Sequence, residues 1–461
     1  MSDRFAVILA AGKGTRMKSP RAKVLHEIGG RSMLAWSVAL AQDLGCKRSV
    51  VVVAPDAPDV AAAARKLVGA ENVVIQREPL GTGNAVDAAR EAFAGVASQG
   101  DGGQAIVLYA DTPLVPKDVC EQAFAALNEG ASVCVLGFDA ALPNRYGRLI
   151  AGESGELEAI VEANDATPEQ LNIPFCNSGV VAAPVKLMFD LLRQVTNDNA
   201  KGEYYLTDLV GLARKRGLKA AAARCDERDV QGVNSQIELA AVERVFQETR
   251  RTELMISGVT MVAPETVFLS YDTKVAPGVT IEPYVIFGVG VSIEAGALVK
   301  SFSHFTSAKV GQSAEVGPFT RLRPGASIGR NAHIGNFVEV KNVTVGEGAK
   351  ANHLAYLGDG EIGSGSNIGA GTIFCNYDGF FKYRTVLGKD VFIGSNSSLV
   401  APINIADGAY VGAASVITED VQADALALAR GHQSVKSGWA KGFRETQSAA
   451  KKAGKKPKGA V

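Results

Sequence analysis

The first half of the chain alternates short apolar runs with segments whose apolar residues recur at helical spacing. Segments 33–44 and 84–94 carry apolar residues three or four positions apart, which is typical of amphipathic helices. The β-branched runs between such segments are FAVILA (5–10), SVVVVA (49–54), NVVIQ (72–76), QAIVLYAD (104–111) and ASVCVLGF (131–138). This order predicts an α/β, Rossmann-like domain whose mostly parallel sheet is covered by helices, with ligands beyond the carboxyl ends of the strands.

The second half follows a six-residue period. Apolar residues fall at every sixth position from Val275 to Phe305 and from Val310 to Val340, and the period returns at 362–374 and 387–417. Such a period predicts a parallel β-helix with one short strand and one turn per repeat, and about seven coils in all. Polar and aromatic residues interrupt the period at 346–361 and 375–386, and we expect these segments to be insertions at corners.

Between the halves, apolar residues at helical spacing predict a long connecting helix, and the sequence after residue 440 is rich in Ala, Gly and Lys. Lysines at 451, 452, 455, 456 and 458 suggest a disordered tail that keeps the protein in solution, or that makes weak contacts with polyanions. We therefore predict four parts: a first domain (1–233), a linker helix (234–262), a β-helix (263–439) and a disordered basic tail (440–461).

Composition narrows the class of partner. The 461 residues include 48 Lys and Arg against 48 Asp and Glu, so no net basic charge favours nucleic acid. The six cysteines form no CxxC pair, which favours reduced, buried thiols over a zinc site. We find no signal segment and no apolar stretch long enough for membrane insertion. These features predict a cytoplasmic protein that acts on small molecules.

The loop LAAGKGTRMKSPRAKVL (9–25) follows the first predicted strand and combines two glycines with five basic residues. The dinucleotide pattern GxGxxG and the NTPase pattern GxxxxGK[ST] both fail at Met17. A glycine turn with Arg16 and Lys23 suits a polyphosphate, although its composition alone is equally compatible with a solvated basic loop.

Eight motifs that follow one another along the chain favour the polyphosphate-binding loop, through their resemblance to a known family. LAAGKGTRM is followed in order by QREPLGTGNAV, LYADTPLV, NRYGRLI, IVEANDA, CNSGVV, GEYYLTD and GVNS. This series resembles the sugar-1-phosphate nucleotidyltransferases, most closely the branch that transfers a uridylyl group to N-acetylglucosamine-1-phosphate. The family has proline before the loop lysine, whereas this chain has Ala22.

The resemblance implies a role for each matching residue. Arg16 and Lys23 would be the catalytic cations that stabilise the transferred phosphorus and the departing pyrophosphate, and Asp111 and Asn234 would bind Mg²⁺. The implied UTP and sugar contacts are Leu9, Ala10, Gly12, Lys23, Gln76, Gly81, Thr82, Gly147, Glu162, Asn177 and Asn234. No general base is expected, because the attacking phosphate oxygen is already ionised.

The repeat half resembles the left-handed β-helix of hexapeptide acyltransferases. Its segments FVEVK, NHLAYLGD and NIGAGTIFCNYDG resemble the acetyltransferase half of a family of bifunctional enzymes, which combine N-acetylglucosamine-1-phosphate uridyltransferase and glucosamine-1-phosphate acetyltransferase. This resemblance implies that glucosamine-1-phosphate binds to Arg323, Lys341, Tyr356, Asn367 and Lys382. It implies that acetyl-CoA binds along Asn376, Tyr377, Ser395, Ala413 and Arg430.

His353 is the implied general base of acetyl transfer, because the ammonium group of an amino sugar must lose a proton before it attacks a thioester. The family pattern places Glu339 nearby as a residue that orients the imidazole. The resemblance also implies a homotrimer whose acetyltransferase sites are shared between subunits.

The whole pattern predicts a bifunctional enzyme of UDP-N-acetylglucosamine synthesis, which supplies peptidoglycan and lipopolysaccharide precursors. It would acetylate glucosamine-1-phosphate with acetyl-CoA and then couple the product to UMP from UTP. Two alternatives remain open: a pyrophosphorylase with another nucleotide or sugar, and a nucleotidyltransferase whose β-helix serves only assembly or regulation. The segments NHLAYLGD and CNYDG argue against the first, and His353 with its cationic neighbours argues against the second.

Overall fold

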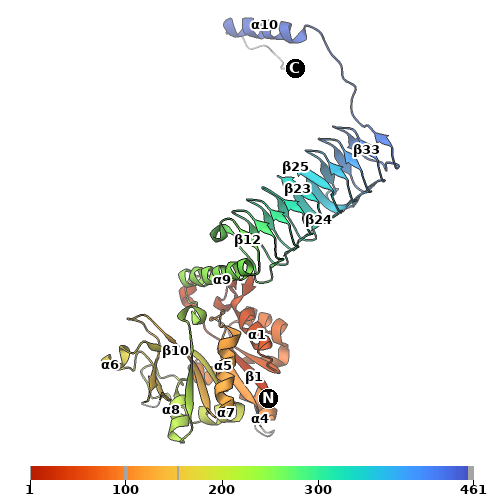
Figure 1. Ribbon diagram of the computed structural model, residues 1–461. Coiled ribbons are helices and arrows are strands. Elements are labelled where there is room, and N and C mark those ends of the chain that lie inside the picture. The colour runs from red at the N-terminus through yellow and green to blue at the C-terminus, as the bar shows by residue number, and fades with distance from the viewer. Residues whose placement is uncertain (1, 98–101, 153–154, 455–461) are drawn as a thin grey trace. The chain divides into compact units, whose positions relative to one another are not determined.

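A computed structural model describes residues 2–97, 102–152 and 155–454 (Figure 1). The chain forms two compact units, residues 1–277 with 282–291, and residues 278–281 with 292–461. Predicted lysines 455, 456 and 458 of the tail lie outside the described residues. Within the described part of the chain, no helix is both long and apolar enough to cross a membrane.

The first unit is built on a mixed sheet with the strand order β11-β7-β10-β6-β1-β4-β5. Strand β10 is antiparallel to both of its neighbours, whereas β6, β1, β4 and β5 are parallel, as are β11 and β7. The strands are β1 (Arg4–Ala10), β4 (Arg48–Val53), β5 (Val73–Ile75), β6 (Gln104–Tyr109), β7 (Val133–Asp139), β8 (Arg148–Ala151), β9 (Leu157–Val161), β10 (Phe175–Pro184) and β11 (Ala220–Cys225). The predicted α/β domain is confirmed.

Helices cover both faces of this sheet because its strands are apolar on both sides. Helices α1 (Met33–Asp43), α2 (Pro58–Val68) and α5 (Lys117–Asn128) pack on one face. Helices α3 (Thr82–Asp87), α7 (Val185–Leu192) and α8 (Asp208–Lys215) pack on the other. The smaller elements of the unit are the hairpin β2 (Glu27–Ile28) and β3 (Arg31–Ser32), and helices α4 (Ala94–Ala97) and α6 (Pro168–Leu171).

The predicted connecting helix is α9 (Gln236–Ile256), and it belongs to the first unit. Its buried Val242 and Phe246 join a cluster with Met17 and Met33, and Trp36 packs against that cluster. The phosphate-loop motif and the connecting helix are therefore held by one apolar core. This unit also contains strands β12 (Thr260–Met261), β13 (Lys274–Val275) and β15 (Ile286–Phe287).

The second unit is a parallel β-helix, as the hexapeptide period predicts. One face stacks β14 (Thr280–Ile281), β17 (Leu298–Val299), β20 (Glu315–Val316), β23 (His333–Asn336), β25 (Lys350–His353), β27 (Asn367–Ile368), β30 (Phe392–Ile393), β33 (Tyr410–Val411) and β35 (Leu426–Ala427). Each strand contributes an inward residue, such as Ile281 or Val411, to a continuous core. In the described part of this unit the face holds nine strands, so the predicted seven coils are too few.

Two longer strands, β24 (Glu339–Val345) and β26 (Tyr356–Ile362), run around a corner and join the other two faces. The strands of these faces are β16 (Ser292–Ile293), β18 (His304–Phe305), β19 (Lys309–Val310), β21 (Arg321–Leu322), β22 (Ser327–Ile328), β28 (Ile373–Cys375), β29 (Thr385–Leu387), β31 (Ser398–Val400), β32 (Ile403–Ile405) and β34 (Val416–Ile417).

The two predicted insertions have different outcomes. Segment 346–361 is a regular coil that contains β25 and most of β26, so this prediction is wrong. The inward position is filled by the small, buried Ala351, which hides the period from a search for large apolar residues. Segment 376–384 connects β28 to β29 and exposes Phe380 and Phe381, as expected for an insertion.

The corners of the β-helix require a left-handed backbone once in most turns. Phe302, Phe319 and Phe337 occupy such positions with φ of 59°, 55° and 57°, which is costly for bulky residues. Their rings stack with centroid distances of 4.9 and 5.2 Å, and each ring is about half exposed. Stacking offsets part of the backbone cost and forms an apolar row, which we call the phenylalanine ladder (Phe302, Phe319 and Phe337).

The tail differs from the prediction of disorder after residue 440. Helix α10 (Trp439–Lys452) begins there, and none of its residues is buried. Its run of Ala, Lys, Arg, Glu and Gln has high helix propensity, which the polar composition had concealed.

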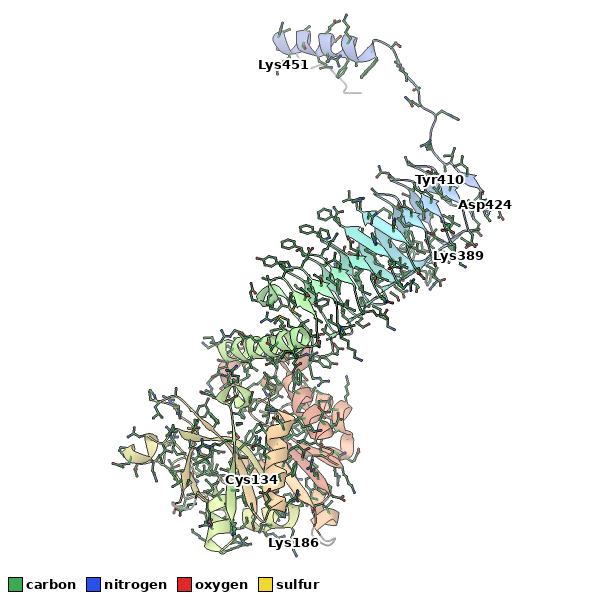
Figure 2. All side chains as sticks on the ribbon, in the orientation of Figure 1. Cys134, Lys186, Lys389, Tyr410, Asp424 and Lys451 are labelled. Atoms are coloured by element: carbon green, nitrogen blue, oxygen red, sulfur yellow. The ribbon has the colours of Figure 1, made fainter. Side chains whose placement is uncertain are left out.

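The cysteines are all free. Cys120, Cys134 and Cys176 are buried, which confirms the prediction for them, whereas Cys46, Cys225 and Cys375 are half-buried; Figure 2 labels Cys134 in the first unit. Burial raises the pKa of Cys120 to about 12 and that of Cys134 to about 11, so both remain protonated thiols at neutral pH.

Candidate active sites

A cavity of about 440 Å³ lies beyond the carboxyl end of β1 in the first unit. Eight of the residues predicted from the sequence line it: Leu9, Ala10, Gly12, Lys23, Gln76, Gly81, Thr82 and Asp111. They lie at the end of β1 and in the segments that follow β1, β5 and β6, whose carboxyl ends meet at one edge of the sheet. Arg16 does not line this cavity; it lies exposed in the short 3₁₀ turn Thr15–Met17.

The loop after β1 depends on a glycine at Gly14. Gly14 has φ +60°, and a Cβ atom built there would lie 2.5 Å from Cβ of Lys23. A side chain at this position would therefore displace Lys23. The close approach explains why a loop that must present a lysine carries glycine here.

Lys23 lies between the two predicted metal ligands. Its Nζ donates to Oδ2 of Asp111 at 2.5 Å and to Oδ1 of Asn234 at 3.1 Å, and its side chain is 7% exposed. The peptide N–H of Val233 donates to the carbonyl of Asp111 at 2.8 Å, which keeps the two loops together. Asn234 immediately precedes the Ser235 cap of α9, so the helix start also fixes this residue.

The loop around Gln76 and Gly81 is held by the backbone of Tyr204. Gly81 has φ +105°, and a Cβ there would lie 2.7 Å from the Tyr204 carbonyl oxygen. The Gln76 Nε2 group donates to the Gly81 carbonyl and to Asn84 Oδ1, at 3.1 and 2.8 Å. Gln76 is buried, so its amide is fixed at the inner wall of the cavity.

The three predicted sugar contacts are also brought together. The Asn177 N–H donates to the Gly147 carbonyl at 2.8 Å, and a Cβ on Gly147 would lie 3.4 Å from Glu162 Oε1. Thr207 Oγ1 donates to Glu162 at 3.3 Å. Burial raises the pKa of Glu162, and the hydrogen bond from Thr207 partly offsets that rise.

Tyr109 and Glu203 line the same cavity but were missed by sequence reasoning. Tyr109 ends β6 two residues before Asp111, a position from which its side chain could have been expected at the same edge of the sheet. A Cβ on Gly179 would lie 2.9 Å from the Tyr109 ring. The ring therefore packs against β10 at the wall of the cavity.

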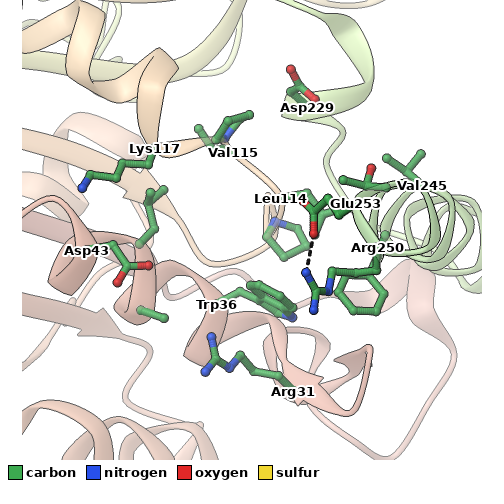
Figure 3. A pocket seen from close by; sticks show the side chains of 16 residues that line it. Arg31, Trp36, Asp43, Leu114, Val115, Lys117, Asp229, Val245, Arg250 and Glu253 are labelled. Atoms are coloured by element: carbon green, nitrogen blue, oxygen red, sulfur yellow. Dashed lines mark hydrogen bonds and ion pairs between the residues drawn. The ribbon is translucent and has the colours of Figure 1, made fainter. Parts of the chain in front are cut away.

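A second cavity of about 290 Å³ contains none of the predicted site residues (Figure 3). It lies between α1, the loop 113–117 that follows Asp111, and α9. Trp36 and Phe246 meet in its wall with a ring distance of 5.6 Å, and Arg250 pairs with Glu253 at its rim.

On the β-helix, the predicted cations stack on successive coils. Arg321, Glu339 and Tyr356 are register partners, and Lys341 pairs with Gly358 two residues further along β24 and β26. Lys382, from the loop after β28, lies beside Lys341, and the neighbouring cation, together with burial, lowers the pKa of Lys341. Arg323, Lys341, Tyr356 and Lys382 therefore form one basic face.

Glu339 pairs with two arginines, whereas His353 bonds to an asparagine. Its carboxylate accepts from Arg323 at 2.7 Å and pairs with Arg321 at 3.8 Å. His353 is exposed at the end of β25, and its Nδ1 bonds to Oδ1 of Asn336 at 2.8 Å. Because an amide oxygen only accepts, Nδ1 carries the proton and Nε2 is the basic nitrogen.

The remaining predicted residues fall at two other places. Asn367 lies in β27, on the other sheet from Lys341, where it pairs with Lys350 and Phe392. Ser395, Ala413 and Arg430 follow one another on three successive turns: the Ala414 N–H donates to Ser395 O at 2.8 Å, and Arg430 donates to Ala413 O at 2.9 Å. Asn376 is buried, and Tyr377 is exposed at the start of the inserted loop.

Two family models define the chain as a two-domain transferase. Residues 6–207 match the MobA-like NTP transferase domain, and residues 307–342 match the bacterial transferase hexapeptide family.

Similar full-length proteins identify the family. The chain is 54% identical to the bifunctional protein GlmU of Caulobacter vibrioides, over 97% of this chain and 96% of that protein. It is 55% identical to the bifunctional protein GlmU of Hyphomonas neptunium, over 98% and 97% of the two chains. With that of Agrobacterium fabrum it shares 51% identity over 98% of each chain. The chain belongs to the family of bifunctional GlmU proteins.

Proposed function

We propose that the first domain transfers UMP from UTP to N-acetylglucosamine-1-phosphate, and that the β-helix acetylates glucosamine-1-phosphate with acetyl-CoA. The observation that carries the proposal is that the nucleotide motifs, which are far apart in sequence, line one cavity. The family relationship supports both activities in one chain.

Uridylyl transfer needs alignment and charge neutralisation more than proton transfer. The attacking oxygen belongs to a phosphate that is ionised at neutral pH, and pyrophosphate is the leaving group. Lys23 faces the cavity and would neutralise the triphosphate, with the exposed Arg16 as the second cation. Gln76 would contact the uracil, and Glu162 and Asn177 would contact the sugar.

Mg²⁺ fits the residues around Lys23. The Lys23 ammonium, a cation, already lies between one carboxylate oxygen and one amide oxygen, those of Asp111 and Asn234. Oxygen ligands of this kind suit a hard divalent ion that retains several waters. Asp111 and Asn234 would hold the ion, which would supply positive charge to the phosphates.

Acetyl transfer needs a base. His353 Nε2 would remove a proton from the ammonium of glucosamine-1-phosphate, while Arg323, Lys341 and Lys382 would bind the phosphate. The freed nitrogen would attack the thioester carbonyl, and its second proton would pass to solvent as the amide forms. The carbon–sulfur bond would break, and the imidazolium would return its proton to the departing coenzyme A thiolate. Ser395, Ala413 and Arg430 would line the path of the coenzyme.

We further propose that the chain acts as a homotrimer in the cytoplasm, where both co-substrates are made. The phenylalanine ladder supports assembly, because a contiguous exposed apolar row is typical of an interface. The separation of Asn367 from the basic face within one chain also supports a site completed by a second subunit.

Two independent readouts test the proposal. The full-length protein is incubated with glucosamine-1-phosphate, acetyl-CoA, UTP and Mg²⁺, and thiol release and pyrophosphate release are followed separately. His353→Ala is expected to lower thiol release at least 100-fold and to leave pyrophosphate release from added N-acetylglucosamine-1-phosphate unchanged. His304→Ala, which alters another exposed histidine of the β-helix, is the matched control.

Lys23→Ala is expected to give the opposite pattern, with pyrophosphate release lost and thiol release retained. If the unmodified protein released pyrophosphate but no thiol, the β-helix would be an assembly module and the acetyltransferase half of the proposal would be wrong.

A further inference from the structure

Asp359 lies between two asparagine side chains on the basic face of the β-helix. Asn342 Nδ2, from the preceding coil, donates to its Oδ1 at 2.8 Å, and Asn376 Nδ2, from the following coil, donates to its Oδ2 at 2.6 Å. Asp359 has a left-handed backbone with φ of 52° and is 8% exposed. Sequence reasoning assigned a role to Asn376 but none to Asp359.

The ionised carboxylate dictates how the Asn376 amide is turned. Burial alone would raise the pKa of Asp359, but the hydrogen bonds from both asparagines, with Lys341 and Lys382 nearby, hold it below its usual value. A carboxylate has no proton to donate, so the asparagine must direct its NH₂ group toward it. The Asn376 carbonyl oxygen Oδ1 therefore points away from Asp359.

The surroundings of Asn376 also hold its side chain in place. A Cβ built on Gly358 would lie 2.7 Å from Asn376 Nδ2 and 2.6 Å from Tyr356 Oη, so the amide packs directly against the Gly358 backbone. The peptide groups of Asn376 are bonded to Phe374 O and Tyr383 N, both at 2.9 Å. Asn376 itself is 6% exposed.

We propose that Asp359 is a positioning residue for acetyl transfer, which fixes Asn376 so that Oδ1 accepts a hydrogen bond from the amino group of the sugar. This inference rests on the proposed acetyltransferase activity. An acceptor binds one N–H of the amine and leaves the nitrogen lone pair for the thioester carbon. A donor at the same place would bind that lone pair and oppose the attack.

A charge exchange between the two residues tests the direction of this hydrogen bond. In Asn376→Asp two carboxylates face each other, and their repulsion is expected to lower kcat of thiol release about 100-fold at pH 8. In the double variant Asn376→Asp with Asp359→Asn, the new amide donates to the new carboxylate, and an oxygen again faces the sugar. We expect at least tenfold recovery of kcat over the single variant, with KM for acetyl-CoA changed less than threefold.

A comparison of Asp359→Ala with Asp390→Ala distinguishes a positioning role from a purely structural one. Both remove an aspartate with a left-handed backbone at a corner, with φ of 52° and 54°, but only Asp359 contacts Asn376. We expect Asp359→Ala to lower kcat of thiol release at least tenfold, and Asp390→Ala to leave it unchanged, at similar melting temperatures.

Three results would overturn the proposal: full activity of Asn376→Asp, a double variant no faster than that single variant, or equal losses in the two alanine variants. The second result would assign a donor role to Asn376, because the double variant has an oxygen but no NH₂ group to face the sugar. Failure of the proposed function itself is distinguishable, since the unmodified chain would then release no thiol. The melting temperature of the β-helix serves as the folding control in every variant, and pyrophosphate release measures the amount of intact first domain.

Discussion

At the scale of single residues, the chemistry depends on a few side chains whose surroundings change their ordinary behaviour. Glu162 is the clearest case in the first domain, because its carboxylate is largely buried and receives one hydroxyl hydrogen bond, from Thr207. Burial raises the pKa of Glu162, so protonation begins at a higher pH than for a glutamate in solution.

The raised pKa of Glu162 predicts how the rate of uridylyl transfer decreases on the acid side of its pH profile, the acid limb. If ionised Glu162 accepts hydrogen bonds from the sugar, kcat/KM for N-acetylglucosamine-1-phosphate falls as the pH decreases through the raised pKa, and activity is present above it. Glu162→Gln should lower kcat/KM about tenfold or more and remove that limb. A pH–rate profile of pyrophosphate release measures both effects, and a limb that persists in the glutamine variant would contradict the assignment.

Ala22 is a second residue with a direct prediction, because the resembling family has proline before the loop lysine. Its φ of −57° already matches that of proline. Ala22→Pro is therefore expected to raise the free energy of unfolding by about 0.4–1 kcal/mol, chiefly by restricting the unfolded chain. Thermal unfolding of the two proteins measures the change. Lys18→Pro is the contrasting variant. Lys18 has φ of 48°, which proline cannot adopt, so this substitution should destabilise the loop.

At the scale of elements, α9 does more than connect the domains. Ser235 caps the helix through a hydrogen bond from the Glu238 N–H at 3.3 Å, and Glu238 Oε2 in turn accepts from the Asn234 N–H at 2.6 Å. The cap thus orients the backbone of a proposed metal ligand. Capping interactions of this kind contribute about 1 kcal/mol to helix stability.

Loss of this capping contact should weaken Mg²⁺ binding more than it lowers the stability of the fold. Glu238→Ala is expected to raise the Mg²⁺ concentration needed for half-maximal uridylyl transfer roughly tenfold, because residues behind metal ligands tune affinity on that scale. Glu248→Ala, an exposed glutamate of the same helix, is the control. Equal Mg²⁺ requirements in both variants would show that the cap has no influence on Asn234.

The elements also show how far sequence reasoning reaches. The family resemblance located Gln76, Gly81 and Asp111, and the structure brings them together because each follows a strand and the ends of parallel strands converge. Asp359 was not predictable, because its partners lie on neighbouring coils and the insertion after β28 hides that register. The coil at 346–361 was missed because Ala351 fills an inward position that the search reserved for large apolar residues.

At the scale of the whole molecule, the acetyltransferase residues do not all gather on one face of a single chain. Arg323, Lys341 and Lys382 form the basic face, whereas Arg430 is held against Ala413 several coils further along. His353 lies at the end of a strand of the other sheet. This distribution favours an assembly in which neighbouring copies contribute different parts of each site.

Subunit complementation distinguishes a shared site from one contained in a single chain. His353→Ala and Arg430→Ala are each expected to release little thiol alone. When both chains are co-expressed, about a quarter of the sites in randomly mixed trimers should combine an intact His353 with an intact Arg430 from another subunit. Light scattering should give a mass of three 48.1 kDa chains, and thiol release should rise well above that of either variant alone. Thiol release no greater than the mean of the two variants would show that one chain supplies both residues. Uridylyl transfer uses neither residue, so it measures how much of the protein with a folded first domain each sample contains.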